Sequence, residues 1–195
     1  MKKIMLGLFG AILSTGSFAQ TAVWNVDATH SNFKFSVTHM VVSEVEGAFK
    51  KYSGTVTSGN ADFIDAVADF TVDVNSVSTD NDDRDKHIKS DDFFNVEKYP
   101  SMHFKSVSFK KVSGNNYILE GDLTIRDITK RVKFDVTYGG TAKDPWGNIK
   151  AGFKAKSTIS RKAYGLKWSA LTETGGLVVS DDVAILLNIE LVKGK

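Results

Sequence analysis

Apolar and polar residues alternate along most of the chain, and phenylalanine occupies many of the apolar positions. Phe33, Phe35 and Val37 alternate with polar neighbours, and residues 66–74 and 183–191 repeat the pattern. Successive side chains of a β-strand point to opposite faces, so each segment is predicted to be a strand with one apolar and one polar face. About eight or nine such segments follow one another, which predicts an all-β, antiparallel protein.

Turn signals and one charged segment interrupt the alternation. Residues 58–60, 113–116, 139–140 and 144–148 are rich in Gly, Asn, Asp and Ser, as expected of hairpin turns. Residues 80–92 lack the alternation and begin with acidic residues, which favour a helix N-terminus. We therefore expect a short helix here, which would cross one end of the sheet structure if the strands close into a barrel.

Strand length favours a barrel over a sandwich, but periodicity alone does not say whether its interior is empty. Closing about eight strands leaves a space that either fills with side chains or holds one small ligand. Small residues such as Gly47, Gly121, Ala66 and Ala151 stand among the inward phenylalanines and would leave room for a ligand. Both a filled barrel and a barrel with a cavity stay open at this point.

The first 19 residues have the features of a signal peptide. Lys2 and Lys3 precede an apolar run, residues 4–13, and small residues lead to Ala19, after which we expect cleavage. The run is too short to span a bilayer, and no later run is long enough. The sequence thus predicts a protein exported to the periplasm without stable membrane insertion, with residues 20–195 forming a single domain.

Composition narrows the function further. The chain has 25 Lys and Arg against 23 Asp and Glu, and removal of Lys2 and Lys3 would leave 23 against 23. A neutral chain argues against a nucleic-acid partner, because phosphate binding needs a cationic surface. The chain has no Cys, which excludes disulfides, thiol catalysis and thiolate metal sites.

Catalytic and metal-binding patterns are weak. Asp27, His30 and Ser31 include the residue types of a hydrolase triad, but neighbours on a strand point apart and the chain has no G-x-S-x-G motif. The acidic run at residues 80–85 lacks the Gly and terminal Glu of a calcium-binding loop. The four histidines show no zinc-site spacing, although a site built from distant residues stays open. We therefore predict a protein that is not an enzyme and has no metal.

A series of short motifs, in fixed order, resembles the YceI-like polyisoprenoid-binding family. The first spans residues 30–39 (HSNFKFSVTH) and is followed by residues 45–49 (VEGAF). Each motif alone is weak, but their order over about residues 24–192 is specific. Further similar motifs lie at residues 78–79, 84–88, 92–94, 99–106, 121–125, 152–153 and 159–165.

The resemblance implies an extended antiparallel eight-stranded, lipocalin-like barrel whose lumen holds a long apolar chain, such as an isoprenoid quinone, a polyprenyl chain or a similar lipid. It implies a periplasmic carrier or reservoir that needs no cofactor beyond this bound lipid. Two alternatives remain: an enzyme acting on a lipid, and a ligand-free stress or interaction protein with a filled barrel. Assembly into a homodimer is also left open.

With this family in view, the inward-facing residues become candidates for the ligand site. His30, Ser31, Arg84, His87 and Arg161 are candidates for contact with a polar head group. The structural alternative is that Arg84 and Arg161 pair with Asp85, Asp92 or Asp27 and hold the short helix over the barrel. The apolar candidates are Phe33, Phe35, Val37, Phe49, Phe70, Val72, Phe94, Phe104, Leu123, Phe134, Val136, Phe153, Tyr164 and Leu187.

Overall fold

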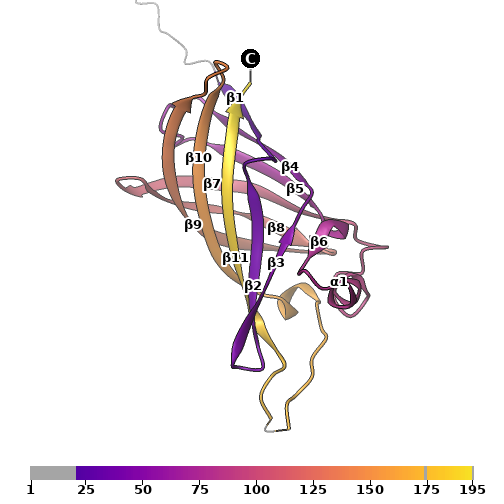
Figure 1. Cartoon of the computed structure of the whole chain (residues 1–195). Helices are drawn as coiled ribbons and strands as arrows, with labels where there is room; N and C mark the ends of the chain where they lie inside the picture. Colours follow the sequence, from indigo (N-terminus) through magenta and orange to yellow (C-terminus); the bar gives the residue numbers. More distant parts are fainter. Residues whose placement is uncertain (1–20, 174, 195) are drawn as a thin grey trace, which may run out of the picture.

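In the computed structural model, residues 21–173 and 175–194 are described, and their strands form one antiparallel sheet that closes on itself (Figure 1). Eight of the described strands complete the ring, in the order β1-β4-β5-β7-β8-β9-β10-β11, and β11 pairs with β1. This confirms the predicted all-β, eight-stranded barrel. The ring strands are β1 (Ala22–Val26), β4 (Tyr52–Ser58), β5 (Val67–Asp73), β7 (Ser101–Ser113), β8 (Asn116–Ile125), β9 (Ile128–Lys143), β10 (Ile149–Ser160) and β11 (Val179–Lys193).

Three more strands extend the wall beyond the ring. They are β2 (Asn32–His39), β3 (Ser43–Phe49) and β6 (Val77–Ser78). The long strand β11 pairs with β1 near its C-terminal end and with β2 over most of its remaining length. β1 and β2 therefore follow one another along the same edge of β11, and the chain leaves the sheet between them at residues 27–31.

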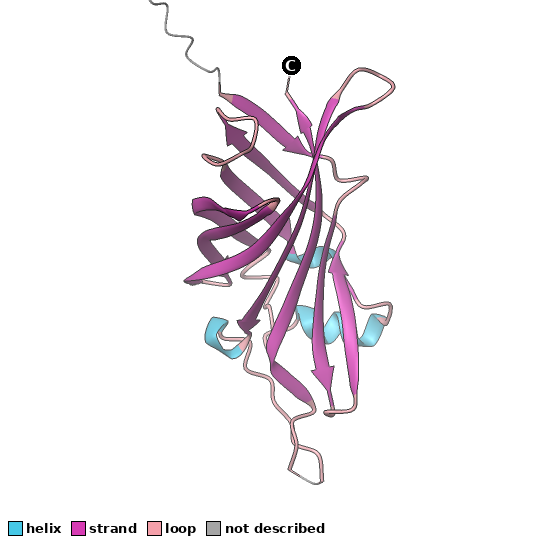
Figure 2. Cartoon of the chain, turned by 90° about the vertical axis from the view of Figure 1, so that its left-hand side faces the viewer, coloured by secondary structure: helices cyan, strands magenta, loops and turns pink. Residues whose placement is uncertain are grey.

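The predicted short helix is confirmed as α1 (Asp82–Lys89). The side chain of Asn81 caps it by accepting a hydrogen bond from the backbone N–H of Arg84 at 2.9 Å, and acidic residues occupy its first turn. The helix lies beside β6 at one end of the barrel (Figures 1 and 2). Two 3₁₀ turns, η1 (Val74–Ser76) and η2 (Lys162–Tyr164), complete the described helical elements.

Inward glycines do not leave the space that their size suggested, because phenylalanine rings from neighbouring strands cover them. A Cβ atom on Gly47 would lie 2.3 Å from the ring of Phe35, and one on Gly54 would lie 2.3 Å from the ring of Phe70. Both pairs are direct cross-strand partners. Glycine allows the large ring of its partner to lie flat on the sheet, so the ring occupies the space that the missing side chain would leave.

The pair Gly139 and Gly140 lies inside β9, where a hairpin turn was expected. The pairing of β9 with β10 shifts register between Gly152 and Phe153, so the glycines lie at a β-bulge that bends a long strand. The predicted turn at residues 144–148 is present and joins β9 to β10.

Aromatic side chains fill the end of the barrel opposite α1. The ring of Phe63 lies 5.1 Å from that of Trp24, 5.6 Å from Tyr138 and 5.1 Å from Phe153, measured between ring centroids. Trp24 and Phe63 are almost completely buried. We call this the closed end of the barrel.

The expected signal peptide, residues 1–19, lies outside the described residues. Among the residues that are described, no helix is long and apolar enough to cross a membrane.

Candidate functional site: an apolar cavity in the barrel

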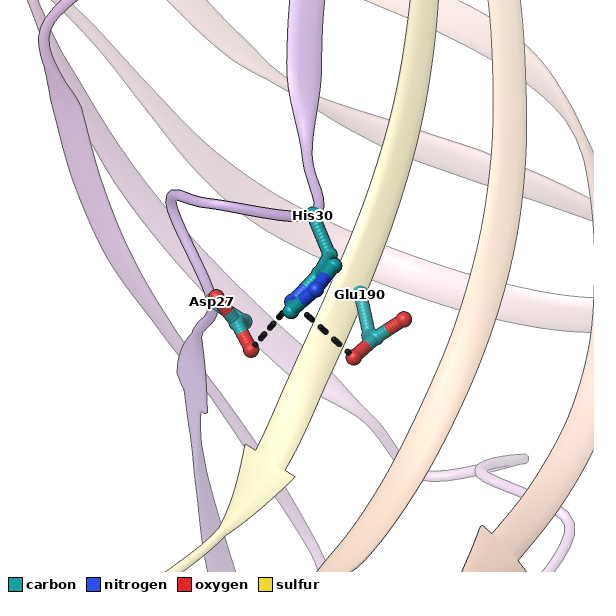
Figure 3. Close-up of side chains that lie close together, drawn as sticks. All are labelled: Asp27, His30 and Glu190. Carbon is teal, nitrogen blue, oxygen red and sulfur yellow. Dashed lines mark hydrogen bonds and ion pairs between the residues drawn. The ribbon is translucent and has the colours of Figure 1, made fainter. Parts of the chain in front are cut away.

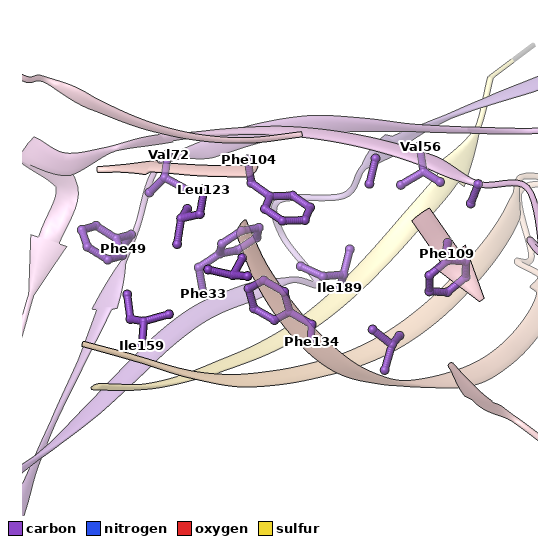
Figure 4. Packing of buried hydrophobic residues seen from close by; sticks show 14 of the residues in the cluster. Phe33, Phe49, Val56, Val72, Phe104, Phe109, Leu123, Phe134, Ile159 and Ile189 are labelled. Carbon is purple, nitrogen blue, oxygen red and sulfur yellow. The ribbon is translucent and has the colours of Figure 1, made fainter. Parts of the chain in front are cut away.

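An apolar cavity of about 480 Å³ lies inside the barrel between α1 and the closed end. Buried apolar side chains from strands on all sides surround it, as the close-up of the interior shows (Figure 4). The structure places all but one of the predicted apolar site residues in its lining. Those in the lining are Phe33, Phe35, Val37, Phe49, Phe70, Val72, Phe94, Phe104, Leu123, Phe134, Val136, Phe153 and Leu187.

The exception is Tyr164, which the structure places outside the cavity lining. The preceding strand, β10, ends at Ser160, and Tyr164 belongs to the 3₁₀ turn η2. The alternation of inward and outward side chains along β10 therefore does not predict where Tyr164 points. The ring is 1% exposed, and its hydroxyl lies buried without a hydrogen-bond partner among the described residues. This burial raises the pKa of Tyr164 to about 12.

Several lining residues were not among the sequence candidates. Ile189 and Leu191 on β11 continue the alternation of Leu187 and could have been found from it, whereas Phe109 on β7 faces inward only because the register shifts between Ser106 and Ser108. Phe63, Phe93 and Trp168 also line the cavity but lie in loops, where no periodicity marks them. Their contribution depends on how the loops fold back over the barrel ends.

Polar side chains line the cavity at the end beside α1, which we call the mouth. Arg84 and His87 on α1 and His39 at the end of β2 all belong to the lining. His39 was missed from the sequence, although it continues the inward parity of Phe35 and Val37. The cavity therefore has an apolar interior and a polar, partly cationic rim.

Arg84 is oriented by Thr79 and not by the carboxylate of Asp85. The Arg84 Nε donates to Thr79 Oγ1 at 2.7 Å, and Nη2 donates to the Thr79 carbonyl at 2.7 Å. Asp85 instead accepts hydrogen bonds from the backbone N–H and the hydroxyl of Thr79. The expected ion pair with Asp85 is thus replaced by two hydrogen bonds that hold the guanidinium at the mouth.

Arg161 is a buried cation that binds backbone carbonyls, so its expected pairing with a carboxylate is also wrong. Its guanidinium donates to the carbonyls of Leu166, Trp168, Ser180 and Val179, at 2.7 to 3.2 Å. The residue is 3% exposed, and this burial lowers the pKa of its guanidinium. Because two of its acceptors lie in the loop between η2 and β11 and two lie at the start of β11, Arg161 shapes that side of the mouth.

His87 connects the two loops at the mouth. Its ring lies edge-on to Phe93 and Trp168, with centroids 5.1 and 5.4 Å away. Its Nε2 also lies 2.9 Å from Asp92 Oδ2. Phe93 and Trp168 stack on each other, so three rings from α1 and two loops meet beside the opening.

His30 and Ser31 lie elsewhere, between β1 and β2, and not among the residues that line the cavity. Figure 3 shows His30 beside Asp27 and Glu190. The imidazole Nδ1 of His30 lies 3.0 Å from Asp27 Oδ2 and 3.7 Å from Glu190 Oε1. The hydroxyl of Ser31 accepts a hydrogen bond from the backbone N–H of Glu190 at 2.9 Å. The chain leaves regular strand pairing between β1 and β2, and His30 and Ser31 link this segment to β11 through their side chains.

The group Asp27, His30 and Glu190 has ligand atoms within 4.8 Å of one another, but a lysine already pairs with both of its carboxylates. Lys150 Nζ lies 2.5 Å from Asp27 Oδ2 and 3.1 Å from Glu190 Oε1. The Lys150 hydrogen bond is the largest cause that holds the pKa of Asp27 far below its usual range. A divalent cation would have to displace this ammonium group, so we assign the cluster to the wall of the barrel.

An antiparallel barrel that encloses an apolar cavity with a polar mouth defines the class of the protein: a lipocalin-like β-barrel. The particular family follows from sequence comparison, since the model of the YceI-like domain matches residues 24–191. The chain belongs to the YceI-like family.

Relatives of known sequence and structure agree with this assignment. The chain is 35% identical to a UPF0312 protein of Photorhabdus laumondii and 34% identical to Protein YceI of Escherichia coli, over 100% of each chain. The crystal structure of BcnA from Burkholderia cenocepacia superposes with a TM-score of 0.72 at 27% identity, covering 85% of this chain and 98% of that one. A polyisoprenoid binding domain from Saccharophagus degradans shares the fold, with a TM-score of 0.64 at 17% identity over 88% and 98% of the two chains.

Proposed function

We propose that this protein binds a long apolar molecule, such as an isoprenoid quinone, a polyprenyl chain or a similar lipid, with the chain enclosed in the barrel. The observation that carries the proposal is the cavity of about 480 Å³, whose interior is lined by aliphatic and aromatic side chains. The description of the Saccharophagus relative as polyisoprenoid-binding supports the same class of ligand. No further cofactor is needed for this role.

The energetics of such a site come from burial. Each methylene group moved from water into the cavity contributes about 0.8 kcal/mol, without any fixed polar contact. A tube lined by Phe, Val, Leu and Ile therefore selects ligands by length and width and tolerates chemical detail in the chain.

The head group of the ligand would lie at the mouth beside Arg84. This guanidinium is oriented by Thr79, lines the cavity and lies on an exposed helix. A charge-assisted hydrogen bond from it to a carbonyl, hydroxyl or phosphate oxygen would add selectivity among heads. Arg161 would act indirectly, because its donors already bind backbone carbonyls.

We further propose that the protein works in the periplasm, as a carrier or reservoir. The support is the signal-like character of residues 1–19. N-terminal sequencing of protein recovered from the periplasm should begin near Gln20, and a chain that retains Met1 and stays inside the cell would contradict this. A homodimer stays a prediction, which sedimentation would test.

A binding role fits the geometry better than lipid chemistry at the Asp27, His30 and Ser31 group. The Ser31 hydroxyl is engaged with the backbone of Glu190, and the His30 imidazole contacts Asp27. The group lies outside the cavity lining, so a chain enclosed in the barrel would not reach it. His30→Ala should therefore leave ligand binding unchanged.

Organic extraction of the purified protein, followed by mass spectrometry, tests the central proposal. We expect one class of long apolar molecule in a near-equimolar amount. Delipidated protein should regain this molecule when it is offered in detergent-free dispersion. Recovery of no ligand, together with no uptake by the delipidated protein, would favour the alternative of a ligand-free stress or interaction protein.

A further inference from the structure

We propose that Phe63 is the floor of the cavity and sets the longest chain that the barrel accepts. This inference rests on the proposed binding of a long apolar ligand and adds the residue that determines its length. Phe63 belongs to the loop between β4 and β5, outside every strand, and strand periodicity gives it no role.

The ring of Phe63 lies on the boundary of the cavity. One side of it lines the cavity, together with Phe109 and Phe153 on the barrel wall. On its other side are Trp24 and Tyr138, at centroid distances of 5.1 and 5.6 Å, and neither of these residues lines the cavity. The ring therefore separates the cavity from the aromatic cluster that fills the closed end.

The backbone holds this ring in place at a conformational cost. Phe63 has a φ of 60°, in the left-handed region that bulky residues rarely adopt. Its carbonyl accepts a hydrogen bond from the N–H of Ala66 at 2.9 Å, and the Tyr117 hydroxyl donates to the carbonyl of Asp62 at 2.9 Å. A strained residue that several contacts hold in position points to a functional requirement, here the inward placement of the ring.

The loop that carries Phe63 is also fastened at its base. Ser58 donates a hydrogen bond to Asp65 Oδ1 at 2.5 Å, and the N–H of Gly59 donates to Asp65 Oδ2 at 3.0 Å. These bonds hold the pKa of Asp65 below its usual range, so its carboxylate is ionised and accepts both hydrogen bonds at neutral pH. The floor is thus a fixed surface that a ligand tail would meet.

A fixed floor produces a length limit. Each methylene that enters the cavity should raise affinity roughly fourfold, until the tail reaches Phe63. Further carbons must then stay outside the mouth in water and bring no gain. Affinity should therefore rise along a series of ligands and stop at a defined chain length.

The test uses delipidated protein and a series of prenyl alcohols that rise by one isoprene unit, namely geraniol, farnesol, geranylgeraniol and geranylfarnesol, with solanesol as a much longer member and dissociation constants from native mass spectrometry. In Phe63→Ala, the limiting length should move to longer chains by roughly one isoprene unit, since the ring removed has a similar volume, and in Phe63→Leu, which removes about half of that volume, it should move less in the same direction. In Phe63→Trp it should move to shorter chains. Smaller and larger side chains at position 63 should shift the limiting length in opposite directions, so the remaining variants still test the proposal if one of them does not fold.

Phe109→Ala is the matched control. Phe109 lines the wall near the same end and stacks on Tyr117 at 4.7 Å. Its removal should weaken binding of all lengths without moving the limit. An unchanged limit in the folded Phe63 variants, or an equal shift in Phe109→Ala, would overturn the assignment of the floor. Failure of the wild-type protein to bind any prenyl alcohol would instead count against the proposed function.

Discussion

At the scale of single residues, side chains of one strand have opposite roles according to their parity. On β9, Phe134 and Val136 are buried in the cavity lining, whereas Asp135 and Thr137 face outward and are exposed. The same change of residue type should therefore have different effects at neighbouring positions. This contrast gives a direct check of the register.

Phe134→Asp should unfold the protein or abolish ligand uptake, because an unpaired carboxylate in an apolar interior costs several kcal/mol. Thr137→Asp, on the outer face of the same strand, should change the unfolding free energy by less than about 0.5 kcal/mol. Thermal melts and ligand extraction measure both variants. A folded, fully loaded Phe134→Asp would show that this residue does not face the ligand.

At the scale of elements, two arginines at the mouth have distinct tasks. Arg161 is buried and fastens the loop between η2 and β11 through backbone carbonyls. Arg84 is exposed on α1 and is oriented by Thr79. One residue therefore builds the mouth, and the other is available to a ligand.

Arg161→Met should lower the unfolding free energy by more than about 2 kcal/mol, because it leaves buried carbonyls without donors. Arg84→Met loses two hydrogen bonds to Thr79 and should lower the unfolding free energy by about 1 kcal/mol, less than Arg161→Met, and it should reduce the preference for one head group over another by roughly ten- to a hundredfold. The measurements are denaturant melts, and competition between farnesol and farnesyl phosphate, which share a tail.

The pair of variants can also contradict this division. Unchanged head-group selectivity in Arg84→Met would place the head elsewhere at the mouth. A stable Arg161→Met with altered selectivity would make Arg161 a ligand contact.

At the scale of the whole molecule, closure of the barrel depends on the short contact between β1 and β11. Only three residue pairs, Trp24 with Lys193, Asn25 with Val192 and Val26 with Leu191, join these strands in the described ladder. Immediately after β1, Asp27 binds Lys150 of β10, and Lys150 also binds Glu190 of β11. This ion-pair group therefore ties three strands together where the ring closes.

Asp27→Asn should lower the unfolding free energy by roughly 2 kcal/mol at neutral pH, since a charge-assisted hydrogen bond to Lys150 is lost. The folded protein holds the pKa of Asp27 well below its ordinary value of 3.8. The contribution of its carboxylate is thus present above pH 3.8 and is lost as pH falls through the lowered folded-state pKa.

Melts of wild type and Asp27→Asn across this range test the assignment. The deficit of the variant should be constant near neutral pH and shrink below pH 3.8. Asp135→Asn, which removes an exposed carboxylate from β9, is the control and should show no such deficit. A deficit in Asp27→Asn that does not depend on pH would mean that the carboxylate charge is not its source.

The sequence by itself determined the strands, their inward faces and the helix. Strand parity is local, because each side chain points opposite to its neighbour whatever the rest of the chain does. That is why Phe33, Phe104 and Phe134 could be assigned to the interior before any contact was known. The order of family-like motifs then indicated a lumen that periodicity alone left undecided.

The tertiary structure alone decided the positions that depend on loops and on partners distant in sequence. Tyr164 follows a 3₁₀ turn and leaves the lining, while Phe63 enters it from a loop. Arg161 binds carbonyls and not carboxylates, and His30 joins a wall cluster with residues 27, 150 and 190. Such contacts arise only when the ring closes and brings chain ends together, so no local pattern could encode them.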